Sequence, residues 1–456
     1  MKKIISTNPA KNYEVIGEVT VSNLNEIKKK VEGANNAKKL WKELGIEKRI
    51  ALLTPLLDQI EERKEELAYL ITKEMGKPIN ESRDDISWDL GYLKSFFKLG
   101  EEYLKDEITH SQGNSLHRII FEPIGSAAVI TPWNFPFDMF LWGVIPNLIA
   151  GNTVIFKHSE ETPLIGKIAE DMMNKLHLPE GVFSEVYGDG NTGAQLVNQN
   201  VDFIWFTGSS TVGKKLFELA GKKFIKSTME LGGSNPAILC EDVDVQKTLG
   251  KIFIKRFLNC GQVCDAVKRL IVHESIFDEI VGELKKILES KIVGEPENEK
   301  TNIGSLVSKT QLLALEVQVE DAIKKGAKIV TGGKRPANLK GAYFLPTILT
   351  NVKPNMKVWH EEVFGPVLPI VSFKTDEEAI KLANDTEYGL GAVVCSKDVE
   401  RAENIAKEIE AGNIDINNGN HWVACTPFGG YKNSGMGREH GRHGFQELCK
   451  IKVIAK

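Results

Sequence analysis

The stretch AAVITPWNF (Ala127–Phe135) decides the fold, because it opens a regular alternation of short apolar strands with helical segments. Helix-like segments such as Leu164–Leu176 and Val212–Leu219 separate the strands. Short apolar runs that alternate with helical patterns are typical of βαβ units and predict a parallel sheet. The strands that follow the first one are TVIFKHSE (residues 153–160), FSEVYG (183–188), FIWFTGS (203–209) and AILC (237–240).

Upstream of this alternation, the first hundred residues look mostly helical, since apolar residues from Ile27 to Leu44 recur with the helical period. A second helical stretch covers roughly Lys48–Met75, and Gly76 is expected to end it. Pro55 is expected to kink this stretch or to lie in its first turn. A third covers roughly Ser82–Leu104. The stretch His110–Gly125 is polar and then β-prone, so we expect it to form a hairpin.

Downstream of Cys264 the strand pattern resumes with RLIVH, AKIVTGG, PVLPIVSF, GAVVCS and GNIDIN. The chain has 456 residues, and single hydrophobic cores stop growing well below that length. We therefore expect two successive α/β domains.

The composition indicates an ordinary globular protein, with 42% hydrophobic residues, 26% charged residues and a formal net charge of −4. This charge argues against a nucleic-acid-binding protein, which usually carries a basic surface. No apolar run is long enough to cross a bilayer, and the N-terminus lacks the apolar segment of a signal peptide. We expect a cytoplasmic protein without a membrane partner, whose six cysteines are mostly thiols.

Two glycine loops are candidates for holding a phosphate at a helix N-terminus. GDGNTG (Gly188–Gly193) formally matches the G-x-G-x-x-G pattern, but no carboxylate follows at the distance that a dinucleotide site requires. TGSSTVG (Thr207–Gly213) follows the strand FIWF and has glycines five residues apart. Either loop can also be a simple tight turn, and the pattern alone does not decide between them.

Glu230 lies between a helix-like segment and a glycine turn in MELGGSNP, close to the expected interior. Burial raises the pKa of a carboxyl group, which suits a general base. A helix-end residue or an ion-pair partner is the alternative for the same position.

Two cysteines lie four residues apart in FLNCGQVCDA (Phe257–Ala266). Cys264 precedes Lys268 and Arg269, and nearby cations lower the pKa of a thiol and favour a nucleophile. A buried packing thiol and a metal ligand are the alternatives. A metal site would need further ligands, and the sequence contains no CxxC and no zinc-finger spacing, so we expect none.

These motifs occur together in a fixed order, and the chain closely resembles the aldehyde dehydrogenase superfamily. Its length, KEMGKPI and the GQVC region resemble the compact succinate-semialdehyde dehydrogenase branch. The motifs that carry the resemblance are PWNFP (132–136), KHSEETP (157–163), FTGSSTVG (206–213), ELGGSNP (230–236), NCGQVC (259–264), EEVFGPV (361–367) and PFGGYKNSGMGRE (427–439).

The resemblance implies that Cys264 is a nucleophile that forms a thiohemiacetal with an aldehyde and then a thioester. It implies that Asn134 and the backbone N–H of Cys264 stabilise the oxyanion, and that Glu230 activates the water that releases the acid. It further implies an NAD(P) cofactor. Cofactor contacts are then expected from Trp133, Lys157, Glu160, Gly208, Ser209, Gly213, Glu230, Glu362 and Phe364.

Glu160 favours NAD over NADP, because a carboxylate accepts hydrogen bonds from ribose hydroxyls but repels a 2′-phosphate. Lys157 is a cation close to it in sequence and weakens that preference. His158 stands where the family usually has proline.

Substrate contacts are expected from Phe137, Trp142, Leu258 and Phe428. Semialdehyde dehydrogenases of this kind commonly use arginines for the distal carboxylate, and Trp142 and Leu258 occupy two of those positions. The sequence therefore predicts a small or apolar aldehyde, with succinate semialdehyde as the alternative if Arg256, Lys432 or His421 supplies the cation. Cys260 is expected to be a packing thiol, or a partner of Cys264 in a reversible disulfide.

The resemblance also implies two Rossmann-like α/β domains plus a small β element for oligomerisation. Residues 1–108 and 124–232 would bind NAD(P), residues 233–432 would be the catalytic domain, and residues 109–123 and 433–456 would form a homodimer or homotetramer contact. The rival functions are a CoA-acylating aldehyde dehydrogenase and a non-catalytic family member, and the presence of Glu230, Cys264 and Asn134 argues against both.

Overall fold

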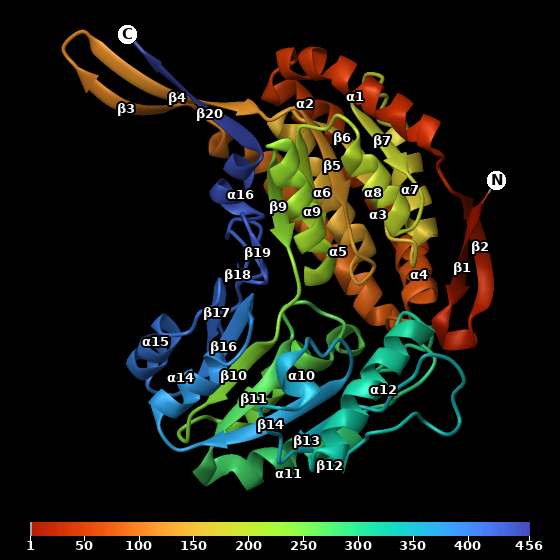
Figure 1. The fold of residues 1–456 in the computed structure, drawn as a ribbon, viewed down its shortest axis with the longest axis vertical. Helices are drawn as coiled ribbons and strands as arrows, with labels where there is room; N and C mark the ends of the chain where they lie inside the picture. Colours follow the sequence, from red (N-terminus) through yellow and green to blue (C-terminus); the bar gives the residue numbers. More distant parts are fainter. Residues whose placement is uncertain (1) are drawn as a thin grey trace.

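The structure is a computed structural model that describes residues 2–456, and two parallel sheets dominate it (Figure 1). The first sheet has the strand order β19-β9-β8-β5-β6-β7. All neighbouring strands run parallel except β19, which pairs antiparallel with β9. Its strands are β5 (Ser126–Ile130), β6 (Thr153–Lys157), β7 (Phe183–Val186), β8 (Phe203–Thr207), β9 (Lys226–Glu230) and β19 (Gly435–Met436).

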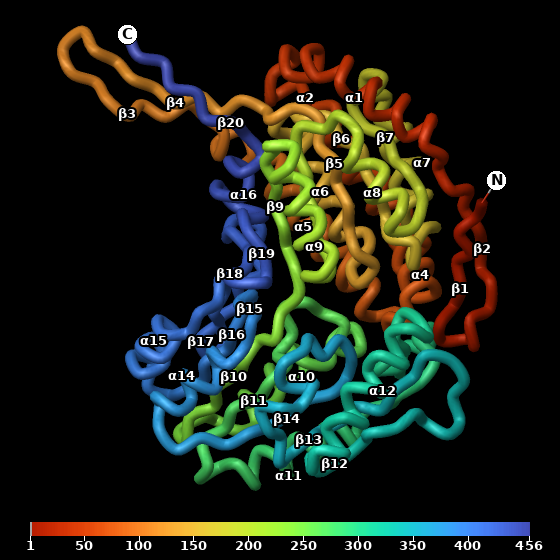
Figure 2. Tube along the Cα trace, in the orientation of Figure 1, coloured from red at the N-terminus to blue at the C-terminus, as the bar shows by residue number. Residues whose placement is uncertain are grey.

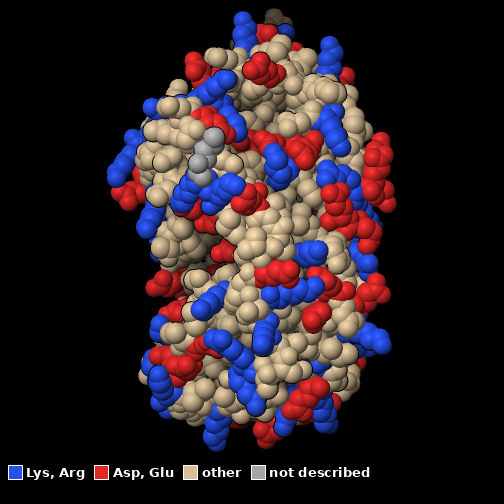
Figure 3. Space-filling model, turned by 90° about the vertical axis from the view of Figure 1, so that its right-hand side faces the viewer, with Lys and Arg blue, Asp and Glu red and all other residues tan. Residues whose placement is uncertain are grey.

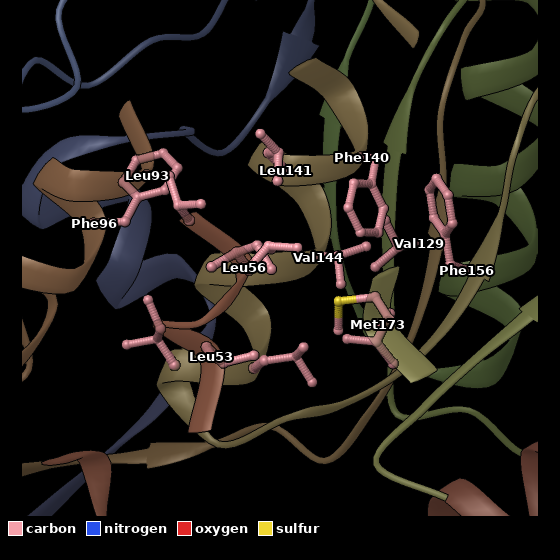
Figure 4. Close-up of a cluster of buried hydrophobic side chains, with 14 of the residues drawn as sticks. Leu53, Leu56, Leu93, Phe96, Val129, Phe140, Leu141, Val144, Phe156 and Met173 are labelled. Atoms are coloured by element: carbon pink, nitrogen blue, oxygen red, sulfur yellow. The ribbon is translucent and has the colours of Figure 1, made fainter. Parts of the chain in front are cut away.

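Helices cover both faces of the first sheet, because its strands are apolar on both sides. Val129 and Phe156 belong to the core on one face, whereas their neighbours Ala128 and Ile155 belong to the core on the other. Figure 4 shows the first of these cores, where side chains from the helices meet those of the strands. The helices around this sheet are α1 (Leu24–Glu43), α5 (Ile79–Tyr103), α6 (Pro136–Ala150), α7 (Pro163–Asn174), α8 (Gly190–Asn198) and α9 (Ser210–Lys223).

The N-terminal region differs in part from the expectation of a mostly helical segment. Strands β1 (Lys3–Asn8) and β2 (Glu14–Thr20) form an antiparallel pair that the sequence reading missed, since both are largely exposed and their apolar alternation is weak. The stretch expected as one helix over 48–75 is divided into α2 (Ile46–Leu53), α3 (Leu56–Glu62) and α4 (Lys64–Met75). Pro55 lies at the first break, where its ring cannot continue the hydrogen-bond ladder.

Two helix predictions in this region are confirmed. The helical period from Ile27 onward lies in α1, with Ile27, Val31 and Trp41 buried. Gly76 ends α4 with a left-handed backbone at φ 81°, a conformation that glycine adopts without steric cost.

The second sheet has the order β12-β13-β14-β11-β10-β16-β17, parallel throughout except for β12. Its strands are β10 (Asn235–Leu239), β11 (Val267–His273), β12 (Lys328–Thr331), β13 (Thr347–Thr350), β14 (Val367–Phe373), β16 (Gly391–Cys395) and β17 (Asn413–Ile416). Apolar cores lie on both of its faces. The associated helices are α10 (Val245–Phe257), α11 (Phe277–Glu289), α12 (Lys309–Lys324), α13 (Lys357–His360), α14 (Asp376–Asn384) and α15 (Val399–Lys407).

A narrow antiparallel arm projects from the body, formed by β3 (Glu107–Gln112), β4 (Ser115–Pro123) and β20 (Cys449–Ala455) (Figure 1). The C-terminal part of the chain returns from the second sheet past the first sheet to this arm (Figure 2). It carries β18 (Tyr431–Lys432), which pairs with β15 (Tyr388–Gly389), and α16 (Gly441–Glu447). The expected α/β class with two Rossmann-like sheets and a small β element is confirmed.

Positive and negative side chains are interspersed over the face drawn in Figure 3. Within residues 2–456, no helix combines the length and the apolar character needed to cross a membrane.

Candidate active site

A cavity of about 600 Å³ lies where the two sheets meet. Its walls include residues directly after the carboxyl ends of β5, β8 and β9, which is the edge of a parallel sheet where ligands bind. The second sheet contributes Cys264, just before β11, and Glu362, just before β14. The sequence places these segments far apart, and the fold brings them to one cavity.

Cys264 lies in a turn that an unusual backbone positions. Asn259, Cys260 and Gly261 all have positive φ angles, of 53°, 55° and 74°. Gly261 has no room for a side chain, because a Cβ there would lie 2.4 Å from the Gly365 carbonyl oxygen. The Asn235 side chain then fixes the turn by donating to the Cys264 carbonyl oxygen at 3.1 Å. This backbone exposes the Cys264 side chain to the cavity.

The pKa of the Cys264 thiol is raised, mainly by burial and then by the carboxylate of Asp265. Lys268 lowers this pKa, as expected for a nearby cation, but burial outweighs its effect. Lys268 donates to carbonyl oxygens of Gly233 and Cys264 and to Glu362, and Arg269 donates to the Ser234 carbonyl oxygen. Both cations therefore bind backbone carbonyl oxygens around the thiol. Their attraction for a thiolate is smaller than the free-energy cost of burying that thiolate.

Asn134 lines the cavity next to the turn that carries Cys264 and is hydrogen-bonded to that turn. Its side-chain amide donates to the Gln262 carbonyl oxygen at 3.1 Å, and its backbone carbonyl accepts from the Asn259 amide at 2.8 Å. An amide nitrogen has two protons, so one Asn134 N–H is available to a ligand. Within residues 2–456, the backbone N–H of Cys264 has no hydrogen-bond acceptor either. These two donors form an arrangement suited to an oxyanion.

Glu230 ends β9 and lines the same cavity with 2% of its surface exposed. Neither carboxyl oxygen has a hydrogen-bond partner within the described part of the chain. Burial raises the pKa of Glu230 well above its ordinary value, and the nearby carboxyl of Glu439 adds to the shift. Glu439 also lines the cavity and accepts a hydrogen bond from the Thr207 hydroxyl at 3.2 Å. A strongly basic carboxyl group beside a thiol is what general-base chemistry requires.

The second glycine loop, and not the first, reaches this cavity. Gly208 and Ser209 line it at the end of β8, and Ser209 caps α9 by accepting from the Val212 N–H. Gly213 lies one turn further, where a Cβ would be 2.4 Å from the Leu231 side chain, so its role is close packing. The positive end of a helix dipole at this place fits a phosphate group. The loop Gly188–Gly193 leads into α8 and is not among the described residues that line the cavity.

Glu362, Phe364 and Trp133 lie together on the cavity wall. The Trp133 and Phe364 rings meet edge to face at 5.5 Å, and Glu362 accepts from Lys268 at 3.1 Å and from the Gly233 N–H at 3.1 Å. A Cβ on Gly232 would lie 2.2 Å from a Glu362 oxygen, so glycine is needed for this approach. A carboxylate acceptor and a flat ring beside a helix N-terminus fit a nicotinamide dinucleotide.

Lys157 and Glu160 lie at the end of β6, outside the described cavity lining. Lys157 is 3% exposed, and its ammonium group donates to Glu160 at 3.4 Å and to the His158 carbonyl oxygen at 2.9 Å. Burial lowers the pKa of Lys157. The His158 side chain is buried, and burial lowers its pKa to about 3, so the imidazole is neutral.

Three of the four expected substrate contacts line the cavity, namely Trp142, Leu258 and Phe428. Phe137 does not. It is fully buried in the core of the first sheet, with its ring 5.7 Å from that of Phe140, because it lies on the inward face of α6. Sequence reasoning missed Trp88, Tyr92 and Trp422, which also line the cavity. The signal for Trp88 and Tyr92 was the spacing of DDISWDLGY along α5, which places the two rings four residues apart on one helix face.

The three side chains considered as cations for a distal carboxylate are engaged elsewhere. Arg256 is fully buried and donates to the Val363 and Gly365 carbonyl oxygens. Lys432 pairs with Glu410. His421 lines the cavity, but its ring nitrogens lie 2.7 Å from Asp265 and 2.9 Å from Asp415.

Cys260 is 1% exposed and packs in the core of the second sheet, with its thiol 3.6 Å from the Gly304 carbonyl oxygen. The expectation of a packing thiol is confirmed, and all six cysteines are free. Among the described residues, no group of three or more His, Cys, Asp or Glu side chains is arranged to hold a metal.

Comparison with known proteins defines the class. A family model described as the aldehyde dehydrogenase family matches residues 1–454. The chain is 37% identical over 466 residues to aminoaldehyde dehydrogenase 1 of Pisum sativum, covering 100% of this chain and 92% of that protein.

Solved structures agree with this comparison. The fold matches an Escherichia coli structure described as an NADP dependent enzyme, with a TM-score of 0.96 and 32% identity, covering 100% of this chain and 95% of that one. A Staphylococcus aureus betaine aldehyde dehydrogenase solved with NAD+ gives a TM-score of 0.95 and 32% identity, covering 100% and 91%. The chain belongs to the aldehyde dehydrogenase family. It is therefore an oxidoreductase, an NAD(P)-dependent aldehyde dehydrogenase.

Proposed function

We propose that this enzyme oxidises an aldehyde to a free carboxylic acid, without CoA, through a thiohemiacetal and a thioester on Cys264. The observation that carries the proposal is that Cys264, Asn134 and Glu230 line the same cavity. Glu362, Phe364 and Gly208 line the same cavity and are the residues proposed to hold the nicotinamide end of the cofactor.

The chemistry assigns one task to each of these groups. The Cys264 sulfur, once deprotonated, forms a bond to the aldehyde carbon, and the carbonyl oxygen becomes negative. The free N–H of Asn134 and the backbone N–H of Cys264 stabilise that charge. The nicotinamide, when bound, accepts the hydride from the former aldehyde carbon.

Glu230 completes the cycle. Its ionised carboxylate takes a proton from water, whose oxygen bonds to the thioester carbon, and the carbon–sulfur bond then breaks. The acid leaves and the Cys264 thiolate is restored. An enzyme that passes its acyl group to CoA does not need a water-activating base, so the buried Glu230 supports hydrolysis.

We propose NAD as the preferred cofactor, with Glu160 as the residue that decides it. The Glu160 side chain is 42% exposed and pairs with a largely buried Lys157. A carboxylate with half its surface free can accept from two ribose hydroxyls and repels a 2′-phosphate. Replacement of Glu160→Ser is expected to shift the ratio of kcat/KM for NAD over NADP toward NADP by about tenfold, which corresponds to one unfavourable charge contact. An unchanged ratio would show that another residue sets the preference.

The walls argue against succinate semialdehyde as the substrate. Among the described lining residues there is no Lys or Arg, and a desolvated carboxylate without a cation partner is costly. We propose an aldehyde that carries no carboxylate, held by Trp142, Leu258 and Phe428. The likeness to the semialdehyde branch is then one of length and motif and not of substrate.

We propose that the arm joins copies of this chain. β3 and β20 are its two edge strands, and Ile108, Ile451 and Val453 on them are between 61% and 70% exposed. Unpaired apolar strand edges favour pairing with another chain. The arm comprises residues 107–123 and 449–455, whereas β19 and α16 pack with the first sheet. We therefore propose that these residues of the arm, most of which belong to the expected element of 109–123 and 433–456, make the contact.

The test is the absorbance of the reduced cofactor with a panel of aldehydes, with and without CoA. We expect turnover of non-carboxylate aldehydes without CoA, and none in a Cys264→Ser variant that still binds NAD. Turnover that requires CoA would favour the acylating alternative, and no turnover with any aldehyde would favour a non-catalytic family member.

A further inference from the structure

One face of α5 forms a wall of the cavity and divides into an acidic and an aromatic part. Glu81, Asp84 and Asp85 line the cavity from the first turns of the helix, and Trp88 and Tyr92 follow at helical spacing. A helix face that lines a cavity in this way offers a ligand both carboxylates and ring faces. The reaction proposed for Cys264 uses none of these side chains.

The aromatic part continues around the cavity as a connected set of rings. The indole of Trp88 is 5.3 Å from that of Trp142 and 5.9 Å from that of Trp422, and Tyr92 stacks on Trp142 at 5.1 Å. Trp422 donates from its indole nitrogen to Asp265 at 3.0 Å, and Asp265 follows Cys264 in sequence. The rings therefore lead from α5 to the residue next to the nucleophile.

The ionisable side chains that line the cavity are mostly acidic. In addition to the three carboxylates of α5, Glu230, Asp265, Glu362 and Glu439 line the cavity, and within the described lining there is no Lys or Arg. His440 lines it too, and burial lowers the pKa of that imidazole to about 3, so it is neutral.

Burial raises the pKa of Glu81 and of Glu439 to about 8 and that of Glu230 well above its ordinary value, so these three are largely uncharged near neutral pH. Asp84 is exposed and has no cation partner within residues 2–456. The cavity thus presents the Asp84 carboxylate and aromatic faces to its contents.

Several cations close to this wall are already paired, and one of them, Lys268, pairs with Glu362 at 3.1 Å. His421 is protonated, because Asp265 and Asp415 outweigh its burial and raise its pKa to about 9, and these same two carboxylates neutralise it. Lys77 pairs with Asp85, and Lys255 pairs with Asp415 at 3.0 Å. Neither lysine is among the described lining residues, and neither neutralises Asp84.

Two of the wall rings already hold cations of the protein itself. The ammonium group of Lys77 lies 3.9 Å from the ring centre of Phe135, and that of Lys255 lies 4.0 Å from the ring centre of Trp422. Aromatic faces attract ammonium groups most strongly where water is excluded. We expect the ring faces that line the cavity to attract the ammonium group of a ligand in the same way.

We infer that the preferred substrate is an aldehyde whose other end carries an ammonium group, held by the Trp88, Tyr92, Trp142 and Trp422 rings with Asp84. This inference rests on the proposed function, because it concerns the substrate of the same cavity. It adds a positive charge, which neither a small nor an apolar aldehyde has.

The test uses pairs of aldehydes that differ only in charge. (Trimethylammonio)acetaldehyde is matched by 3,3-dimethylbutanal, and 4-(trimethylammonio)butanal by 5,5-dimethylhexanal, in which carbon replaces nitrogen. We expect kcat/KM to be at least about tenfold higher for the cation in one or both pairs, as expected for one ammonium group held by rings and a carboxylate. Equal or lower values for both cations, with turnover of the neutral partners, would overturn the inference and leave the proposed function intact.

A binding measurement separates this inference from the proposed function. Calorimetric titration with choline and with 3,3-dimethylbutan-1-ol compares a cation with its neutral isostere without any turnover. Tighter binding of choline supports the cation site even if no aldehyde is oxidised, in which case the proposed function fails alone. Equal binding of the two alcohols would count against the cation site.

Variants on α5 locate the effect. Asp84→Asn removes an exposed charge, and Trp88→Leu removes a ring face while keeping an apolar side chain. Both are expected to lower the preference for the cation, measured as the ratio of kcat/KM for the cation to kcat/KM for its neutral partner, about threefold to tenfold. Glu101→Gln, an exposed carboxylate at the far end of the same helix, is the matched control and should change neither value. A preference retained in both α5 variants would place the cation elsewhere and contradict the inference.

Discussion

Glu230 is the residue whose chemistry depends most on its surroundings. The same carboxyl group on the surface would be ionised at neutral pH and weakly basic. In this protein its burial and the proximity of Glu439 raise its pKa well above the ordinary value, and neither oxygen has a partner within residues 2–456. Cys264 is affected in the same direction, since burial raises the pKa of its thiol. Both groups are therefore less ionised at neutral pH, and each is a stronger base or nucleophile once it is ionised.

Replacement of Glu230→Gln keeps the shape of the side chain and removes the base. We expect a burst of reduced cofactor equal to the number of active sites, followed by a steady rate lower by about 10²–10⁴-fold, because the thioester then hydrolyses without general-base help. Stopped-flow absorbance measures both phases. Glu218→Gln, at an exposed position on α9, is the control and should keep the steady rate. An unchanged steady rate in Glu230→Gln would exclude its role as base.

The pH dependence of the rate follows from the two raised pKa values. Cys264 must lose a proton to attack, and Glu230 must lose one to act as a base. Since both pKa values are shifted upward, the active ionised forms increase as the pH rises above neutral. We expect kcat/KM to increase steadily from about pH 7 to about pH 9, beyond the ordinary range of a carboxylate. A profile that is flat or falls over this range would contradict the buried state of both groups.

At the level of secondary-structure elements, the segment from the end of α10 to the start of β11 positions the nucleophile. It holds three successive left-handed residues, and the amides of Asn259 and Gln262 bind it to Asn134 and to the Val307 N–H. Such backbone conformations cost free energy and persist only where surrounding contacts fix them. The segment therefore couples the position of Cys264 to that of the proposed oxyanion donor.

Replacement of Gly261→Ala tests this coupling. The new Cβ would require φ near 74° and would lie 2.4 Å from the Gly365 carbonyl oxygen. We expect the free energy of unfolding to fall by about 1–3 kcal/mol and kcat to fall more than tenfold, because Cys264 is displaced. Denaturant unfolding and steady-state kinetics measure these effects. Gly282→Ala in α11, where a Cβ meets no atom within 4 Å, is the control and should be neutral or stabilising. Normal kcat in Gly261→Ala would show that the turn tolerates movement.

At the level of the whole molecule, the cavity exists because two sheets from successive parts of the chain face each other, and the C-terminal segment crosses back to the first sheet (Figure 2). Glu439 reaches the cavity through this return. The same segment ends in β20, so the arm and the cavity wall belong to one continuous stretch.

The arm gives a prediction about assembly. Ile451 and Val453 are 64% and 61% exposed on β20. If the arm joins copies as proposed, the double replacement Ile451→Lys with Val453→Lys is expected to lower the molecular mass in solution, since it places charge on the edge proposed to pair. Size-exclusion chromatography with light scattering measures the mass. Ile292→Lys, an exposed apolar residue outside the arm, is the control and should leave the mass unchanged. An identical mass for the arm variant would exclude the arm as the contact.

The sequence by itself determined the α/β class, the hairpin near residue 110, the end of α4 at Gly76 and the residues now found around one cavity, because strand alternation, glycine turns and motif order are local features. It did not determine the weak strands β1 and β2 or the core position of Phe137, since these depend on contacts between distant segments. Only the tertiary structure decided that the pKa of the Cys264 thiol is raised. Lys268 and Arg269 are near Cys264 in sequence, but in the structure they bind carbonyl oxygens while burial raises the pKa. The tertiary structure alone also assembled the rings of Trp88, Trp142 and Trp422, which come from three distant parts of the chain and meet only when both sheets are packed.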